Sequence, residues 1–413
     1  MRGRAPVFIR PSVAGLPLPA YKFTEARLAE LEARLGRPLV RLQSNESYRA
    51  PPPRVAAAAA AAAAAANRYP CAASSELCGM LGARLGAPAA RVAVTNGSEQ
   101  AIRLIGEAFL DDTCVCVAPA PTFPVYSTAL RASGCQVVSV GLDATGANDA
   151  EALGAAAAAA AAARGSAAGD DDAGARTVVV CSTVNNPTGG RMGAAALRTL
   201  RDALPSSTLL VVDDAYAEFE AVGARAGEPD ALAVLVEGDA RVDGGGGGCH
   251  HWILLRTFAK AWGLAGLRVG YALASSEEVA GGLHRAKGVF QVNACAQAAA
   301  AAALREGDAW MYERVRHTVA MRATLLRRLC SLGLPTLPAH ANFVCFDVWP
   351  ASAAEVATRL AEERGVLVCP LGALRGADGL LLREAVRVTV GDEADIEALL
   401  EALPAVLALQ PAR

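Results

Sequence analysis

A series of short apolar runs, each ending in a polar turn and leading into a helix-forming segment, most constrains how this chain can fold. The clearest run opens residues 209–219, LLVVDDAYAEF, and similar runs open residues 177–190 and 92–110. Consecutive apolar residues are typical of strands buried on both faces, as in parallel sheets. Because strands and helices alternate from about residue 92 to 290, we predict an α/β fold built on a mostly parallel sheet.

The polar residues directly after these runs are the first candidates for a functional site, because open α/β sheets bind ligands at the carboxyl ends of their strands. Asp213, Asp214 and Tyr216 follow one run, and Asn186 follows another in the turn Asn-Asn-Pro-Thr-Gly-Gly. Each feature alone also has an ordinary structural explanation, since strand-end acids cap helices and Asn-Pro pairs form turns. Together they predict a polar site at one edge of the sheet.

Residues 255–271, LRTFAKAWGLAGLRVGY, carry a lysine whose neighbours suit covalent catalysis. The amine of Lys260 can condense with an aldehyde. Thr257 and Arg268 supply a hydroxyl donor and a rigid cationic fork, the groups that hold a phosphate. Three glycines in the segment argue against a plain amphipathic helix. The segment indicates pyridoxal 5'-phosphate (PLP), attached to Lys260 and held through its phosphate.

The strand-end residues suit the ring of such a cofactor. A carboxylate from Asp213 or Asp214 can pair with a protonated pyridine nitrogen, which keeps the ring electron-poor. Tyr216 and Asn186 can each hydrogen-bond the 3-oxygen of the ring. These roles make Lys260, Asp213, Tyr216 and Asn186 the candidate catalytic residues.

A second anchor for the phosphate is expected where residues 92–110 pass from a strand into a helix. Gly97, Ser98 and Glu99 stand at the start of that helix, and backbone N–H groups at a helix start bind anions. An ordinary N-cap has the same appearance. The helix start is therefore a candidate phosphate site only because Thr257 and Arg268 independently indicate a phosphate.

One aromatic side chain of residues 119–126, PAPTFPVY, is expected to stack on the pyridine ring. Phe123 and Tyr126 are the two candidates, and we favour Phe123. Packing of both rings in the core is the alternative interpretation.

The order of these motifs along the chain resembles that of the fold-type I PLP enzymes, the aspartate aminotransferase superfamily, over roughly Leu42 to Gly391. Within it the segments NRYP, PTFPVY and VRVTVG are most similar to those of the histidinol-phosphate aminotransferases. The resemblance implies a mostly parallel, seven-stranded sheet sandwiched by helices, plus a smaller α+β domain. We expect a large PLP-binding domain at 42–290, a small domain at 291–413 and an N-terminal arm at 1–41 that joins the small domain.

The resemblance also assigns roles residue by residue. Asp213 matches the ring-nitrogen carboxylate, since it stands three positions before Tyr216. Tyr69 resembles the tyrosine that reaches the PLP phosphate of the partner subunit, which implies a homodimer with shared active sites. Arg387 resembles the arginine that clamps the substrate α-carboxylate, although a surface ion pair is the simpler alternative. Asn45 is expected beside the substrate.

Three features depart from the family pattern. The usual Asn-Glu-Asn-Pro-Tyr-Gly segment is Asn-Glu-Ser-Tyr-Arg-Ala at residues 45–50, and Ala259 replaces the usual serine before the lysine. Cys369 stands where the histidinol-phosphate aminotransferases have an arginine that helps bind the substrate phosphate. Arg375, on the glycine-bearing loop that is expected to follow, is a candidate replacement.

These motifs predict transfer of an amino group between an amino acid, such as glutamate, and a biosynthetic amine like histidinol phosphate. Aromatic or other amino acids are alternative substrates. A decarboxylase of the threonine-phosphate type is an alternative reaction, because it shares nearly all the motifs. A non-catalytic relative is a third possibility, and the intact Lys260, Asp213 and Arg268 argue against it.

Composition excludes several other classes. The 413 residues include 41 acidic and 39 basic ones, so a nucleic-acid partner is not expected. No long, strongly apolar run predicts a membrane span. Eleven irregularly spaced cysteines indicate a reducing compartment, taken as the cytoplasm. Cys249, His250 and His251 could meet at a metal, but a loose loop is the simpler interpretation and no metal is expected.

The remaining segments are interpreted as arms, linkers and surface helices. Arg2, Arg4 and Arg10 without any acid suggest a short organellar transit peptide, but an arm that crosses the partner subunit is the preferred interpretation. The alanine run before NRYP predicts a helix. Residues 244–248, five glycines, predict a flexible linker, and the insertion ending at 169–172 predicts a surface loop.

Overall fold

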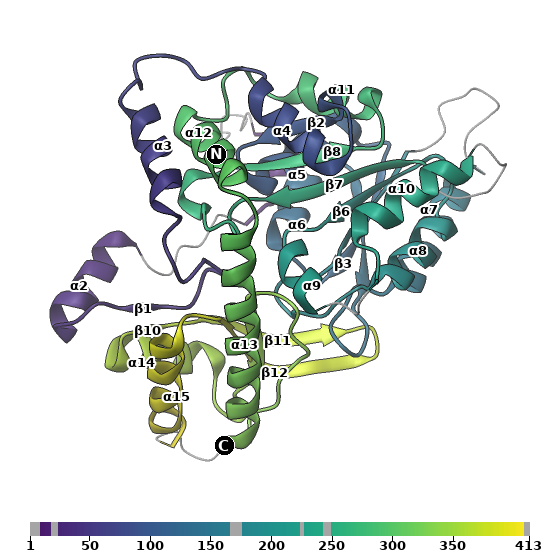
Figure 1. The fold of residues 1–413 in the computed structure, drawn as a ribbon. Helices are drawn as coiled ribbons and strands as arrows, with labels where there is room; N and C mark the ends of the chain where they lie inside the picture. Colours follow the sequence, from purple (N-terminus) through teal and green to yellow (C-terminus); the bar gives the residue numbers. More distant parts are fainter. Residues whose placement is uncertain (1–8, 18–23, 166–175, 224–226, 243–248, 409–413) are drawn as a thin grey trace, which may run out of the picture.

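The computed structural model describes residues 9–17, 24–165, 176–223, 227–242 and 249–408. A large body holds a central sheet, and a smaller body lies at the far end of the long helix α13 (Ala309–Ser331) (Figure 1). The first eight residues, the acidic insertion and the glycine linker lie outside the described residues, so the predictions for them stay predictions.

The central sheet has seven strands in the order β2-β8-β7-β6-β5-β3-β4. Only β8 runs antiparallel to its neighbours, so the prediction of a mostly parallel sheet is confirmed. The apolar runs at residues 177–190 and 209–219 form the inner strands β5 and β6, and the run at residues 92–110 forms the edge strand β2. The strands are β2 (Val92–Thr95), β3 (Val115–Ala120), β4 (Gln136–Gly141), β5 (Thr177–Ser182), β6 (Thr208–Asp213), β7 (His251–Thr257) and β8 (Gly270–Ala274).

Helices cover both faces of this sheet, because successive side chains of each strand point to opposite faces and both sets are apolar. One face packs against α3 (Pro53–Ala63), α4 (Ser75–Leu85), α7 (Ala150–Gly165), α8 (Ala194–Ala203), α10 (Ala231–Val242) and α12 (Ala294–Glu306). The other face packs against α5 (Gly97–Phe109), α6 (Pro124–Ala132) and α11 (Glu277–Ala286). The predicted sandwich of helices around the sheet is thus confirmed.

The smaller body combines helices with short strands, as expected for an α+β unit. Its antiparallel sheet has the order β11-β12-β9, and a separate parallel pair joins β1 to β10. The helices α14 and α15 and the distal half of α13 cover these strands. The elements are β1 (Val40–Arg41), β9 (Phe343–Asp347), β10 (Val366–Leu367), β11 (Cys369–Gly376), β12 (Gly379–Thr389), α14 (Ala353–Arg364) and α15 (Glu393–Ala408).

The described N-terminal helices attach to different bodies. Helix α2 (Glu25–Leu35) packs its buried leucines against α14, and Arg27 forms a 2.6 Å ion pair with Glu362. Helix α1 (Pro11–Ala14) lies on α6, where the Ser12 hydroxyl donates to the carbonyl of Ala132 at 3.1 Å. Helix α12 packs in the core of the central sheet. The predicted domain boundaries stay a prediction. By its packing, α12 belongs to the large body, although it follows the predicted boundary at residue 290.

The hairpin of β11 and β12 connects the two bodies beside the carboxyl ends of the large sheet (Figure 1). The backbone N–H of Ala377, at the hairpin turn, donates to the carbonyl of Leu142 at 2.8 Å. A Cβ at Gly141 would lie 2.6 Å from the Cα of Ala377, so this contact requires a glycine. The hairpin thus fixes where the smaller body stands relative to the large sheet.

Two local predictions were wrong. Arg375 was expected on a loop, but it lies in strand β11 opposite Leu380, because register shifts let the glycine-bearing segment pair with β12. The segment at Cys249 was expected to be a loose loop, but its thiol is buried against the carbonyl of Thr208 at 2.9 Å, and His251 begins β7. In both segments pairing with a distant strand outweighs the local sequence preference.

The described helices include none that is both long and apolar enough to cross a membrane.

Candidate active site

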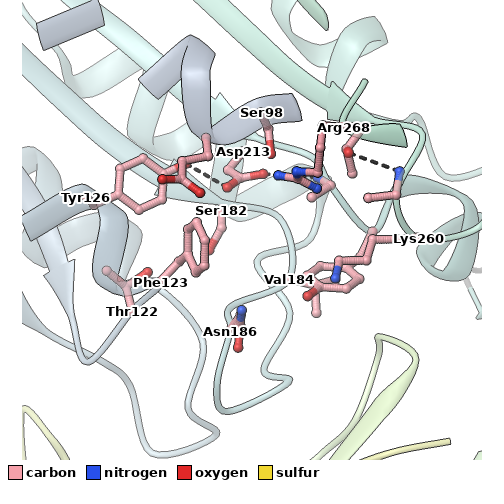
Figure 2. A pocket seen from close by; sticks show the side chains of 15 residues that line it. Ser98, Thr122, Phe123, Tyr126, Ser182, Val184, Asn186, Asp213, Lys260 and Arg268 are labelled. Atoms are coloured by element: carbon pink, nitrogen blue, oxygen red, sulfur yellow. Dashed lines mark hydrogen bonds between the residues drawn. The ribbon is translucent and has the colours of Figure 1, made fainter. Parts of the chain in front are cut away.

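A cavity of about 680 Å³, including its open mouth, lies at the carboxyl ends of β5, β6 and β7 and at the start of α5. Most of the predicted site residues line it, as Figure 2 shows. They are Ser98, Glu99, Phe123, Tyr126, Asn186, Asp213, Tyr216, Thr257, Lys260 and Arg268. The structure therefore brings together side chains from elements more than 150 residues apart in the sequence, such as Ser98 and Lys260.

Lys260 lies three residues beyond the end of β7, and its side chain projects into the cavity. Its Nζ donates to the carbonyl of Asn45 at 2.9 Å. Burial first, and then the nearby charge of Arg387, lower the pKa of Lys260 to about 8. Neutral amine, the form that acts as a nucleophile or a proton acceptor, is therefore more abundant near neutral pH than on an ordinary lysine.

One end of the cavity is built to receive an anion. Gly97, the first residue of α5, has φ +78°, and a Cβ there would lie 2.9 Å from Nη2 of Arg268. Glycine thus lets the guanidinium close over the positive end of a helix of 13 residues. Thr257 and Ser98 line the same end. The Glu99 carboxylate bonds Arg103 at 3.0 Å instead, so its backbone N–H is the group available to an anion.

The cavity lining also holds a half-buried carboxylate, Asp213, and the structure distinguishes it from the neighbouring Asp214. Asp213 lines the cavity and accepts from the Tyr126 hydroxyl at 2.6 Å and from the N–H of Ala215 at 3.1 Å. Asp214 is 2% exposed, lies outside this cavity and pairs with Arg256 at 2.8 Å. Burial raises the pKa of Asp213 to about 6. Asp213 is therefore the carboxylate that can meet a protonated ring nitrogen.

Two side chains can serve the ring oxygen beside Lys260. The Tyr216 hydroxyl accepts from Nδ2 of Asn45 at 3.1 Å, and burial raises the pKa of Tyr216 to about 12. Tyr216 thus keeps its proton and can donate it to an acceptor in the cavity. Asn186 accepts from Arg387 through Oδ1. Its Nδ2 has no partner among the described residues and is available as a second donor.

Arg387 lies on β12 and joins the smaller body to the site through Asn186 of the cavity lining. It donates to Asn186 and, at 3.0 Å, to the carbonyl of Gln43, while its Nε is buried without a partner among the described residues. Cys369 is its register partner on β11, and Cys345 its partner on β9. Register partners share a face of an antiparallel sheet, so a cysteine lies on each side of Arg387.

Two predicted residues lie away from this cavity within the protomer. Tyr69 is 82% exposed and stacks on Phe290, with ring centroids 4.5 Å apart. Arg375 is exposed on β11, near the tip of the hairpin. Their proposed roles therefore stay predictions.

The sequence did not point to several residues that shape the site. Ser182, Thr122 and Val184 line the cavity. Ser182 ends β5, so the rule that used the ends of strands could have found it. Asn342 donates to the same Asn45 carbonyl that Lys260 contacts, at 3.1 Å. It precedes a strand of the smaller body, and no local pattern marks it.

These groups fit PLP. The helix start with Arg268 and Thr257 suits a phosphate, Asp213 suits a ring nitrogen, and Lys260 suits an aldehyde between them.

Comparison with known proteins agrees with this chemistry. The family model for aminotransferase class I and II matches residues 37–403. Histidinol-phosphate aminotransferase 2 of Caulobacter vibrioides is 36% identical over 92% of this chain and 90% of its own length.

Solved structures agree as well. The PLP complex of histidinol-phosphate aminotransferase from Sinorhizobium meliloti superposes with a TM-score of 0.77 and 26% identity, covering 98% of this chain and 99% of that one. Aspartate aminotransferase of Thermus thermophilus, as a single mutant, shares the fold with a TM-score of 0.72 and 24% identity, covering 98% of this chain and all of its own. The chain therefore belongs to the aminotransferase class I and II family and is a PLP-dependent aminotransferase of fold type I.

Proposed function

We propose that this aminotransferase exchanges an amino group between histidinol phosphate and 2-oxoglutarate, with glutamate as the amino acid of the pair. The observation that carries the substrate assignment is the similarity to the Caulobacter vibrioides protein, which extends over nine-tenths of both chains. The site must then bind two anionic substrates in turn, one with a phosphate and one with carboxylates.

The side chains divide the chemistry among them. PLP, when bound, supplies an aldehyde that takes up the amine and a ring that withdraws electrons from the substrate carbon. Asp213 holds the ring nitrogen, and Tyr216 and Asn186 donate to the ring oxygen. The neutral Nζ of Lys260 accepts a proton from the substrate carbon and returns it, and the Asn45 carbonyl 2.9 Å away steadies the amine.

Arg387 binds the anionic group of both substrates. Lys260 and Arg268 are the cations of the cavity lining, and both are engaged by the cofactor in this proposal. Arg387 is the next cation, in contact with Asn186 of the lining. Since Cys369 beside it carries no positive charge, the phosphate of histidinol phosphate depends on the same guanidinium as the glutamate carboxylate.

We expect purified enzyme to convert histidinol phosphate with 2-oxoglutarate, and Arg387→Ala to raise the KM for both histidinol phosphate and glutamate. Loss of a charge-assisted contact costs about 1.5–3 kcal/mol, or roughly 10-fold to 150-fold in KM. Steady-state kinetics in both directions measures this, with absorbance confirming that the variant still holds PLP.

Two further variants locate the phosphate. Arg375→Ala changes an arginine of the neighbouring strand that lies outside the cavity, and a rise in KM for histidinol phosphate alone would assign the phosphate to Arg375. Cys369→Arg should lower the KM for histidinol phosphate. A wild-type enzyme that ignores histidinol phosphate and acts on an unphosphorylated amine or aromatic amino acid would contradict the substrate assignment.

The enzyme acts as a homodimer with shared sites in this proposal. What supports it is an exposed apolar patch formed by Tyr69, Phe290 and Val289, of which Val289 is 72% exposed. Exposed apolar groups that gather in this way mark protein interfaces. Gln100 of α5 bonds Gln291, so the patch adjoins the helix that begins the phosphate cradle.

A mixture of Lys260→Ala and Tyr69→Ala subunits, each inactive alone, should therefore regain activity. Random exchange gives heterodimers with one intact site, for about a quarter of wild-type activity. Assays after subunit exchange, with sedimentation to count subunits, measure this. A fully active monomer, or no recovery in proven heterodimers, would refute the shared site.

We place the enzyme in the cytoplasm. All eleven cysteines are free thiols, and most are buried in the cores. A reducing compartment keeps thiols in this state.

A further inference from the structure

We infer that Tyr126 is a positioning residue that acts through Asp213: its hydroxyl holds the carboxylate that faces the ring nitrogen, and Phe123 is left as the aromatic partner of the ring. This inference rests on the proposed role of Asp213 beside PLP. It separates two aromatic residues that the sequence presents as interchangeable candidates for stacking.

The hydrogen bond itself carries the argument. Oη of Tyr126 lies 2.6 Å from Oδ2 of Asp213, within the range of hydroxyl bonds to ionised carboxylates. Oδ1 accepts from the N–H of Ala215. With one donor on each oxygen, the carboxylate is fixed in orientation, and its remaining lone pairs can serve the cavity (Figure 2).

The burial of the two rings also separates their roles. Tyr126 is 1% exposed in the core between α6 and the sheet, and Phe123 is half-buried at the cavity. The rings meet edge to face, with centroids 6.4 Å apart and an interplanar angle of 82°. Tyr126 therefore contacts Asp213 through its hydroxyl and Phe123 through its ring.

Several titratable groups face Asp213, and Tyr126 is the side chain that hydrogen-bonds it. Burial raises the pKa of the carboxyl and Asp214 raises it further, whereas the Tyr126 hydrogen bond and Lys260 lower it. Burial, and then Asp213, raise the pKa of Tyr126 well above its usual value, so the phenol remains a donor. Cys181 and Tyr216 also interact with Asp213, and burial raises the pKa of both, which keeps them neutral. The charged Arg268 lines the same cavity (Figure 2).

The test is Tyr126→Phe, which keeps the ring and removes only the hydroxyl. If Tyr126 contacted the cofactor through its ring, this variant would bind PLP normally. If it holds Asp213, the carboxyl pKa rises, and less of the ionised form is present near neutral pH. We expect the acid limb of the binding profile to move up by about one pH unit, so that the dissociation constant of PLP rises about twofold at pH 7 and nearly tenfold at about pH 5.

Tyr271→Phe is the matched control. Tyr271 is also a buried tyrosine, on β8, but its neighbours are Phe258 and Arg256, and it lies outside the cavity. The affinity of the Tyr271→Phe variant for PLP and its pH profile should match those of wild type. PLP titration of apoprotein across pH 5–9, followed by absorbance, gives these values without any assay of turnover.

A double-mutant cycle with Asp213→Asn supplies the second measurement. Once position 213 has no carboxylate to hold, adding Tyr126→Phe should leave the affinity for PLP nearly unchanged. Additive losses, or a Tyr126→Phe variant with wild-type affinity and pH profile, would overturn the inference. Failure of wild-type protein to take up PLP at Lys260 would instead refute the proposed site.

Discussion

Lys260→Ala should lose about 10⁴-fold or more in turnover together with the absorbance of bound cofactor. The change removes both the amine that attaches PLP and the group that moves the proton, and proton transfer alone contributes roughly 10²–10⁴-fold. The lowered pKa of Lys260, to about 8, fits both tasks. Absorbance spectra, PLP content after dialysis and kinetics measure the loss.

The chain is well suited to locating the attachment chemically, because Lys22 and Lys287 are its other lysines. Borohydride reduction and peptide mapping should leave the pyridoxyl group on the peptide that contains Lys260. Lys287→Ala is the matched control, since Lys287 is also partly buried with a lowered pKa but donates to the carbonyl of Val94. A pyridoxyl group on the Lys287 peptide would mean that the site is misassigned.

Asp213→Asn should retain PLP, although more weakly, and lose about 10²–10⁴-fold in turnover. An amide cannot stabilise a protonated ring nitrogen as a carboxylate does, so the ring withdraws electrons less strongly. Because burial raises the pKa of Asp213 to about 6, its charge is costly in the cofactor-free protein above that pH. The variant should therefore not lower the melting temperature of apoprotein at pH 7.

Asp214→Asn should behave in the opposite way. It weakens a buried ion pair with Arg256, so the free energy of unfolding should fall by up to about 3–5 kcal/mol. Turnover per folded site should change little. Thermal unfolding and PLP-normalised kinetics of the two variants separate these effects. Equal losses of turnover at both positions would show that Asp213 is not the distinctive carboxylate.

The sequence predicted the sheet, the helices on both its faces and most of the cavity lining. It could do so because these features are local: an apolar run specifies a buried strand, and the polar residues that follow it must emerge at the strand's carboxyl end. Thr257 and Lys260 at the end of β7 and Asn186 beyond β5 are such cases. The anion cradle was also predictable, since Gly97 and Ser98 begin a helix directly after a strand.

Pairing between distant segments could not be predicted in the same way. Arg375 was assigned to a loop because its neighbours include glycines, but antiparallel pairing with β12 makes the segment a strand. Asn342 reaches the Asn45 carbonyl across 297 positions of the sequence. Neither contact leaves a periodic trace in the residues around it.

What the sequence by itself determined is the kind of chemistry: an amine at Lys260, a carboxylate near the end of β6 and an anion site at the start of α5, in an order that belongs to PLP aminotransferases. The residues alone left Asp213 and Asp214 open and the family resemblance favoured Asp213, but only the tertiary structure shows what distinguishes the two carboxylates physically. Asp213 and Asp214 are adjacent on the chain, but one meets the Tyr126 hydroxyl at the cavity and the other meets Arg256 behind it. Adjacent residues of an extended segment point to opposite sides, so the partners packed on each side decide which side becomes the active site.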